Sequence, residues 1–402
     1  MRIVRIVTRL NIGGPSLHVS LLSTQLDASR FETCLVVGRA GEKEGDLSSQ
    51  VAARGARMIR LHHLVRPIRP WRDLLAWIRL VGILFKERPQ ILHTHMAKAG
   101  TLGRLAGIFY NRLGPGRIPK ERMTLIHTFH GHVLEGYFSP WWSKRFAAVE
   151  RWLAHRTNCL IAVSPRIRNE LLEEGIGCKG SWRVIPLGLD LSGFVELSLP
   201  QGTRPLRCGL VGRLVPIKNP QLFLQAFGQL IREGISPDLR GVIVGEGPLR
   251  QTLEAEVRSE RLESHLHFTG WQEEMRCCYR NLDIVCLTSL NEGTPLSLIE
   301  AMASGRAVVA TDVGGVRDLL ADGTSDLPPI PRGGFSVTPV GILFRSGDAQ
   351  GLAAALRHLA RNAPLRQALG EAARRHVKER FNHERLLREI SSLYEEFAGS
   401  RL

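Results

Sequence analysis

The chain alternates between short apolar runs and longer segments whose apolar positions recur at helical spacing. In the first half, the short runs lie at 3–7, 34–37, 91–94, 125–128 and 159–163. In the second half, they lie at 207–211, 241–244, 267–269, 284–288 and 307–310. Short apolar runs separated by amphipathic helices, such as the helix expected at 15–26, are typical of parallel strands with both faces buried. The pattern therefore predicts an α/β fold with doubly wound parallel sheets.

Two series of strands predict two Rossmann-like domains. A loose, proline-containing stretch separates the series, so we expect an N-terminal domain at 1–195 and a C-terminal domain at 205–380. A last helix at 381–402 can cross back to the first domain. A length of 402 residues suffices for two cores. The segment 324–340 is rich in proline and glycine and is expected to be an insertion loop.

Composition narrows the class of protein. Apolar residues make up 44% of the chain, as in a globular protein, and the formal net charge is +16. Such a charge raises the alternative of a nucleic-acid-binding protein. The basic residues are, however, dispersed through predicted helices without a recognisable nucleic-acid-binding module, so no specific nucleic acid is expected. Seven cysteines without a C-x-x-C pair favour a reducing compartment over a disulfide framework.

No segment is expected to span a membrane. The longest apolar run, 74–85, is short and is interrupted by Arg79. The first ten residues resemble an arginine-punctuated strand rather than a signal peptide. We expect a cytoplasmic protein that can associate peripherally with the inner face of the cell membrane.

A loop and the helix after it carry two glutamates eight positions apart, Glu292 and Glu300. Thr294 is the predicted N-cap and Pro295 the first helical residue, positions that favour these residue types. Gly305 is expected to end the helix. Glu300 would then lie about 9 Å along the axis from the cap, at roughly 1.5 Å per residue. This distance suits a carboxylate that binds a ribose while the helix start holds the phosphates.

The start of this helix predicts an anion site. The backbone amides of Thr294, Leu296 and Ser297 would be free to bind a diphosphate. Two basic residues, Arg213 and Lys218, follow the strand predicted at 207–211 and would add positive charge beside it. The alternative for this pair is solvated surface charge. The arrangement predicts a nucleotide-sugar site.

The block that starts with these glutamates resembles a known family. Glu292-x7-Glu300 is followed by Ala-Met-Ala-Ser-Gly-Arg-Ala-Val-Val-Ala at 301–310 and Val-Gly-Gly-Val at 313–316. The pair of glutamates alone is a weak signal, but the ordered block is specific. It resembles the retaining glycosyltransferases of family 4, also called glycosyl transferases group 1. The resemblance implies the GT-B fold, in which two Rossmann-like domains face each other across a cleft, the first on the acceptor side and the second on the donor side.

The same family places a glycine loop after the first strand, and Gly13 and Gly14 match it. A turn without a ligand is the alternative. The family also places a histidine near the donor sugar, and His130, within His127-Thr-Phe-His130-Gly-His132, matches best. These three histidines could instead ligate a metal. No neighbouring Cys or Asp completes a recognisable set, so we expect no metal.

The resemblance implies transfer of a sugar from a nucleoside-diphosphate donor, with UDP favoured, to an acceptor hydroxyl with retention of configuration. The acceptor would be a saccharide or a lipid-linked saccharide, as in bacterial cell-surface polysaccharide or glycolipid assembly. No cofactor is implied. The chain also lacks the Asp-x-Asp pattern that holds a divalent ion in the other main glycosyltransferase fold, which predicts metal independence. A nucleotide-sugar 2-epimerase of the same architecture is the alternative.

The implied roles divide among a small set of residues. His130, Glu292, Arg213 and Lys218 would be catalytic: the glutamate holds the donor sugar and the two cations stabilise the departing diphosphate. Glu300 would bind the ribose. The expected donor-binding residues are Gly13, Gly14, Arg213, Lys218, Glu292, Gly293, Thr294, Pro295, Leu296, Ser297 and Glu300.

Two segments of the first domain combine basic and aromatic residues. The first, 66–88, consists of a basic start at 66–72 that leads into an amphipathic stretch at 74–88. The second, 137–146, contains Trp141 and Trp142. Such segments favour an anionic membrane surface. For the first segment, the alternative is an ordinary packing helix before the strand at 91–94.

Overall fold

The structure is a computed structural model that describes residues 1–11, 13–41, 45–131, 140–200, 205–235, 238–321 and 327–399, without the side chains of 140–143. His132 and most of the segment 137–146, including both tryptophan side chains, lie outside this part of the chain. The chain forms two compact units. The first consists of Met1–Leu189 together with His383–Leu402, and the second of Asp190–Asn382.

The first unit is built on a seven-stranded sheet in the order β3-β2-β1-β4-β5-β6-β7, in which all strand pairs are parallel. Its inner strand β1, which lies between β2 and β4, is buried along five of its six residues, because its two faces are covered by helices. All the strands predicted for this half are present. The strands are β1 Arg2–Val7, β2 Glu32–Val37, β3 Met58–Arg60, β4 Ile91–His95, β5 Thr124–Phe129, β6 Cys159–Ala162 and β7 Trp182–Val184.

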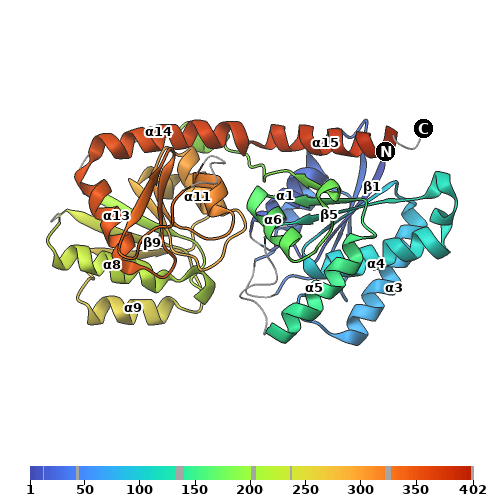
Figure 1. Cartoon of the computed structure of the whole chain (residues 1–402), viewed down its shortest axis with the longest axis horizontal. Helices are drawn as coiled ribbons and strands as arrows, with labels where there is room; N and C mark the ends of the chain where they lie inside the picture. Colours follow the sequence, from blue (N-terminus) through green and yellow to red (C-terminus); the bar gives the residue numbers. More distant parts are fainter. Residues whose placement is uncertain are drawn as a thin grey trace. The chain divides into compact units, whose positions relative to one another are not determined.

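Helices connect these strands in the right order for a doubly wound sheet (Figure 1). Proline stands in the first turn of several of them, including α3 and α6, where its missing N–H is not needed. The helices of this unit are α1 Gly14–Thr24, α2 Ser48–Ala53, α3 Pro70–Glu87, α4 Ala97–Leu113, α5 Pro140–Ala154, α6 Pro165–Glu173 and α15 His383–Gly399, with 3₁₀ turns at Pro115–Arg117, Pro119–Glu121 and Lys179–Ser181.

The last helix, α15, belongs to the first unit although it follows the second unit in sequence (Figure 1, red). Its buried side chains join a cluster with Ile3 of β1, Ile126 of β5 and Ile161 of β6. The hydroxyl of Tyr394 reaches further in and accepts a hydrogen bond from Arg5 Nη2 at 3.4 Å. The first core is therefore completed by the end of the chain.

The second unit has a seven-stranded sheet in the order β10-β9-β8-β11-β12-β14-β13. All its pairs are parallel except β13–β14, which is an antiparallel hairpin. The strands are β8 Leu206–Val211, β9 Leu239–Val244, β10 Leu266–Gly270, β11 Ile284–Leu287, β12 Ala307–Thr311, β13 Phe335–Thr338 and β14 Gly341–Phe344. The structure thus confirms two mostly parallel sheets with connecting helices.

The segment 324–340 is not simply an insertion loop, as the sequence had suggested. Phe335–Thr338 forms the edge strand β13 and pairs with β14. Two four-residue strands joined by a tight turn leave too short a pattern to be distinguished from loop in a stretch rich in glycine and proline.

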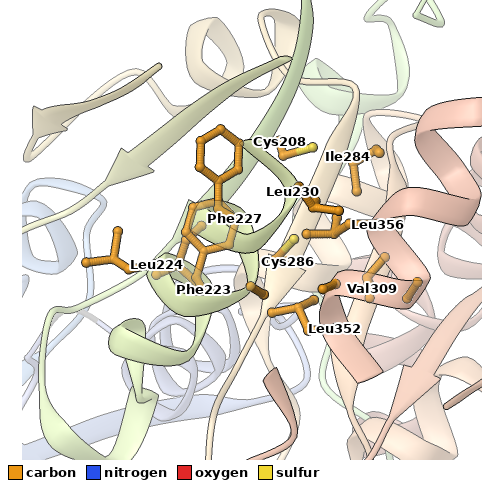
Figure 2. Close-up of a cluster of buried hydrophobic side chains, with 14 of the residues drawn as sticks. Cys208, Phe223, Leu224, Phe227, Leu230, Ile284, Cys286, Val309, Leu352 and Leu356 are labelled. Carbon is orange, nitrogen blue, oxygen red and sulfur yellow. The ribbon is translucent and has the colours of Figure 1, made fainter. Parts of the chain in front are cut away.

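The helices of the second unit cover both faces of its sheet. They are α7 Ser192–Val195, α8 Pro220–Arg232, α9 Arg250–Ser259, α10 Met275–Arg280, α11 Leu296–Ala303, α12 Val316–Leu320, α13 Ala349–Arg361 and α14 Ala363–Arg380, with a 3₁₀ turn, η4, at Pro216–Lys218. Figure 2 shows Phe223 and Phe227 of α8 packed near Leu352 and Leu356 of α13 over strands that carry Cys208 and Cys286. This core fixes the strand ends from which the candidate site is built.

Candidate functional site

Two loops of the second unit are joined at the carboxyl ends of neighbouring strands, β8 and β11. The amide of Leu290, after β11, donates to the carbonyl of Ile217, in η4, at 2.8 Å. The hydroxyl of Thr288 donates to the carbonyl of Lys218 at 2.8 Å. These bonds hold the basic loop that follows β8 against the loop that carries Glu292.

Lys218 and Glu292 form an ion pair through Nζ and Oε1. The hydroxyl of Ser289, which is fully buried, donates to the same carboxylate oxygen at 2.6 Å. The Lys218 side chain is 27% exposed and that of Glu292 10%. Glu292 is thus oriented by two donors, while the ammonium of Lys218 remains accessible.

A glycine turn holds the backbone of Glu292. A Cβ added to Gly314 would lie 1.9 Å from the carbonyl oxygen of Glu292, and φ at this position is 45°. The amide of Gly315 donates to that same carbonyl at 3.1 Å. A side chain at Gly314 would therefore displace Glu292.

Helix α11 begins one residue later than the sequence predicts. Pro295, with ψ of 112°, is the N-cap, and none of the side chains that the structure describes caps the helix. The predicted cap, Thr294, is wrong, because the extended conformation of Pro295 places Thr294 outside the helix. Its buried hydroxyl has no partner among the described residues. Gly305, with φ of 71°, follows the C-cap as expected.

Glu300 lies in the middle of α11 and contacts Tyr279 of α10. The two residues are joined by a hydrogen bond of 3.0 Å between Tyr279 Oη and Glu300 Oε2. Tyr279 Oη also lies 2.9 Å from the carbonyl of Ser297. Burial raises the pKa of Glu300 to about 7 and that of Tyr279 well above its usual value. Glu300 is thus partly protonated near neutral pH and is positioned by a residue that the sequence did not single out.

Arg213 follows β8 and has an exposed side chain. Its guanidinium forms no hydrogen bond or ion pair with another residue that the structure describes; its backbone carbonyl accepts a hydrogen bond from the amide of Val215 at 3.0 Å. The structure therefore brings Lys218 together with Glu292, and Tyr279 with Glu300, but does not join Arg213 to either pair. Its role stays a prediction.

In the first unit, histidines gather at the carboxyl ends of β4 and β5 and on α1. His95 Nδ1 lies 3.1 Å from His130 Nε2, and the ring of His18 packs edge-on against His130 with centroids 5.0 Å apart. His93 lies behind them, with Nδ1 2.6 Å from Tyr394 Oη and Nε2 2.7 Å from Thr128 Oγ1.

Burial keeps these imidazoles neutral. It lowers the pKa of His130 to about 3 and lowers the pKa values of His18 and His95 well below the usual value. Both ring nitrogens of His18, Nε2 of His95 and Nδ1 of His130 have no partner among the described residues. The cluster can therefore offer neutral donors and acceptors to hydroxyl groups of a sugar.

The same three residues also have the geometry of a potential metal site. One ligand atom each from His18, His95 and His130 lies within 4.8 Å of the others, and three neutral imidazoles are a ligand set that zinc takes. This set differs from His127, His130 and His132, which the sequence suggested. His127 instead bonds to Thr94 Oγ1 at 2.8 Å and packs against α4. The sequence alone did not identify His18 as a member of this set, because it lies more than a hundred positions from His130.

The glycines expected to approach the donor lie at the start of α1. Gly13 is the N-cap and Gly14 the first residue of the helix, which lacks a side-chain cap. Their contact with a donor stays a prediction, as do the assigned roles of the other site residues.

Comparisons with known proteins identify the family. Residues 12–192 match the family described as Glycosyltransferase Family 4, and residues 205–362 match the one described as Glycosyl transferases group 1. The chain belongs to glycosyltransferase family 4. The resemblance carried by the block that begins at Glu292 is thereby confirmed, and the protein is a glycosyltransferase.

Two relatives illustrate the family's range. The chain is 30% identical to the UDP-Gal:alpha-D-GlcNAc-diphosphoundecaprenol alpha-1,3-galactosyltransferase of Escherichia coli over 63% of its own length and 65% of that protein, just under two thirds of it. It is 28% identical to the lipopolysaccharide core biosynthesis mannosyltransferase LpcC of Rhizobium leguminosarum bv. viciae, over 64% of this chain and 69% of that one.

Solved structures of glycosyltransferases share the fold. Anabaena Alr3699/HepE, crystallised with UDP and glucose, superposes with a TM-score of 0.77 at 18% identity, covering 98% of this chain and 100% of that one. The GT-B fold expected from the sequence is thus confirmed.

Proposed function

We propose that this glycosyltransferase moves a hexosyl group from a UDP-sugar to an acceptor hydroxyl with retention of anomeric configuration. The observation that carries the proposal is the paired arrangement of Lys218 with Glu292 and of Tyr279 with Glu300 around the start of α11. A cation and free helix amides suit a diphosphate, and a carboxylate one turn further suits a ribose. The UDP-bound structural neighbour supports this choice of donor.

In the proposed reaction, the bond between the anomeric carbon and the diphosphate breaks, and the acceptor oxygen bonds to that carbon on the same face. The acceptor proton passes to the leaving phosphate oxygen. Lys218 and Arg213 stabilise the negative charge that grows on the diphosphate. Glu292 binds hydroxyls of the donor sugar, Glu300 binds the ribose, and His130 lies near the sugar.

This assignment requires no metal ion. The charge on the departing diphosphate is met by Lys218, Arg213 and the amides of Leu296 and Ser297 at the start of α11, which donate to no described group. The histidine cluster serves in this proposal as a set of neutral hydrogen-bonding groups.

The acceptor is proposed to be a saccharide carried on a lipid, in the assembly of bacterial cell-surface polysaccharide or glycolipid. Support comes from the two relatives, whose names specify a diphosphoundecaprenol-linked acceptor and lipopolysaccharide core biosynthesis. The protein would work at the inner face of the cell membrane. No helix within the described ranges is long and apolar enough to cross a bilayer.

The test is a donor panel with product analysis. Purified protein is incubated with UDP-, GDP- and ADP-hexoses, and binding is followed by thermal shift. Transfer of radiolabel from the binding donor to a bacterial lipid extract is then measured, and NMR of the product gives the anomeric configuration. The proposal expects a UDP-sugar to bind and to yield an α-linked product. Formation of an epimeric UDP-sugar without transfer, or preference for another nucleotide, would contradict it.

A further inference from the structure

Helix α3 presents apolar side chains on two opposite faces. Ala76, Leu80 and Leu84 are fully buried against the sheet. At 100° per residue, the positions on the other side fall within about 100° of one another. They are Trp71, Leu74, Leu75, Ile78 and Phe85, all exposed; Trp71 is 81% exposed and Ile78 51%. Packing against the sheet uses only the buried face. The exposed apolar face is therefore not explained by packing within the first unit.

A row of cations borders the exposed apolar face. Arg72, Arg79 and Lys86 recur every seven residues and therefore lie on one flank of α3. All three are exposed, and none forms an ion pair within the described residues. The row is parallel to the apolar face over most of the helix, whose 18 residues span about 27 Å at 1.5 Å per residue.

The apolar face continues onto α4. Trp77 of α3 packs edge-on against Phe109 of α4 with centroids 5.5 Å apart, and the two helices lie side by side (Figure 1). Between them is an open groove of about 620 Å³. It is lined mainly by apolar side chains from both helices, among them Leu74, Trp77, Leu105 and Phe109; its charged lining residues are Asp73 and Arg112. Asp73 is paired with Lys98.

The end of α4 repeats the same combination of side chains. Leu113 is 72% exposed, and Ile118, in the turn that follows, is 59% exposed. Arg117 and Lys120 flank Ile118 and are exposed. Exposed apolar side chains bordered by cations match the two layers of an anionic bilayer surface, its hydrocarbon boundary and its negatively charged headgroups.

We propose that the exposed face of α3, the α3–α4 groove and the turn after α4 form a surface that docks on an anionic lipid bilayer. The apolar side chains enter the headgroup boundary, and the row Arg72, Arg79 and Lys86 binds lipid phosphates. Through this surface the enzyme would reach the lipid-linked acceptor. The identity of the acceptor rests on the proposed function, whereas the docking itself rests on the exposed side chains of α3 and α4. The α3 part of this surface lies within the segment 66–88. The packing-helix alternative for that segment is confirmed by the buried Ala76, Leu80 and Leu84, while the opposite face of the same helix is exposed.

The test is co-sedimentation with vesicles of phosphatidylglycerol and phosphatidylethanolamine, compared with phosphatidylcholine alone, at low and high salt. Wild-type protein is expected to sediment with the anionic vesicles and to be released by salt. The double variant Trp71→Ser, Ile78→Ser removes apolar contact, and the triple variant Arg72→Gln, Arg79→Gln, Lys86→Gln removes the row. Each is expected to reduce the bound fraction at least fivefold.

Matched controls lie in the second unit. Arg258→Gln, Arg361→Gln, Lys378→Gln removes three exposed cations and lowers the net charge equally, and Val337→Ser removes an exposed apolar side chain. Both controls are expected to sediment like wild type. Equal loss in the charge control would show that net charge alone attracts the protein and would overturn the proposal.

Two further measurements keep the proposals separate. UDP-sugar binding, measured by thermal shift, is expected to be the same in the α3 variants as in the wild type. If the wild-type protein bound no UDP-sugar, this would count against the proposed function and would leave the docking proposal unaffected. Sedimentation velocity reports whether a second copy covers this face instead. A wild-type dimer that dissociates in the Trp71→Ser, Ile78→Ser variant, without vesicle binding, would overturn the docking proposal.

Discussion

Lys218 and Glu292, 74 positions apart in the chain, form an ion pair beside the start of α11. The pair depends on bonds between the two loops and on the glycine turn at Gly314, rather than on sequence proximity. Ser289 adds a second donor to the same carboxylate oxygen. The cation that we propose binds the diphosphate and the carboxylate that we propose binds the sugar are thereby held in one hydrogen-bonded group.

Replacement of either member of this pair should lower turnover. Lys218→Ala removes a charge that is most needed as the diphosphate departs, so kcat should fall on the order of 10²-fold. Glu292→Gln should lower kcat by a similar factor, since the sugar loses a charged acceptor. Because the residues act together, the double variant should lose less than the product of the single effects. Steady-state kinetics on the four proteins measures this; fully multiplicative losses would show that the pair does not act as a unit.

Donor affinity should depend on pH through Glu300. Ribose hydroxyls donate to a carboxylate, so the ionised form binds, whereas burial keeps the carboxyl protonated below a pKa of about 7. Affinity for UDP-glucose should therefore rise with pH and level off above pH 7, and at pH 6 it should be roughly tenfold weaker than the plateau. Calorimetry from pH 5.5 to 8.5 measures it. The Glu300→Gln variant should bind weakly and lose this dependence; a pH profile identical to wild type would exclude Glu300 as its source.

The same pKa makes stability depend on pH. The folded state holds the proton of Glu300 up to about pH 7, whereas the unfolded chain releases it near the ordinary value of 4.5. The contribution of this group to stability is therefore complete at low pH and declines as pH rises between about 4.5 and 7. In urea unfolding, Glu300→Gln should gain stability relative to wild type across that window. A constant difference between the two proteins would contradict the raised pKa.

Much of this architecture could be predicted from hydrophobic pattern, because buried parallel strands are short apolar runs. The block from Glu292 to Gly305 was also predictable, since its glycine, proline and helix-forming positions are local signals. Edge strands such as β13 were missed, since four half-buried residues give little periodicity. Likewise, the sequence of 66–88 did not show whether its helix packs against the sheet or exposes an apolar face. Helix α3 has one face of each kind.

The partners of the site residues could not be predicted for a different reason. Tyr279 reaches Glu300 because two helices meet in space, and no local pattern marks that contact. His18 reaches His130 because a helix start and two strand ends converge. The cap at Thr294 was misplaced by one residue, which is within the uncertainty of any helix boundary drawn from sequence.

The histidine cluster should matter for rate without requiring a metal ion. His130→Ala should lower kcat by about one to two orders of magnitude, roughly the effect of one lost hydrogen bond near the reacting atoms. With its pKa near 3, His130 stays neutral from pH 5 to 8 and should introduce no inflection in the kcat profile there. Dialysis against EDTA should leave the rate unchanged. Loss of activity that zinc restores, and that fails to be restored in His18→Ala, would instead assign His18, His95 and His130 to a required ion.

Among the ion pairs that the structure describes, we expect the buried pair of Arg104 and Glu150 in the first unit to contribute most to the free energy of unfolding. Arg104 of α4 is fully buried, and its Nη2 donates to both carboxylate oxygens of Glu150 of α5 at 2.8 and 2.6 Å. Glu150→Ala would leave a buried guanidinium unpaired and should cost about 3–5 kcal/mol of unfolding free energy. The exposed pair of Arg232 and Glu260, at 2.7 Å, is the control, and Arg232→Ala should cost no more than about 1 kcal/mol. Urea unfolding of both variants checks this; equal and small effects would show that water reaches Arg104 and that the α4–α5 contact is not held by this pair.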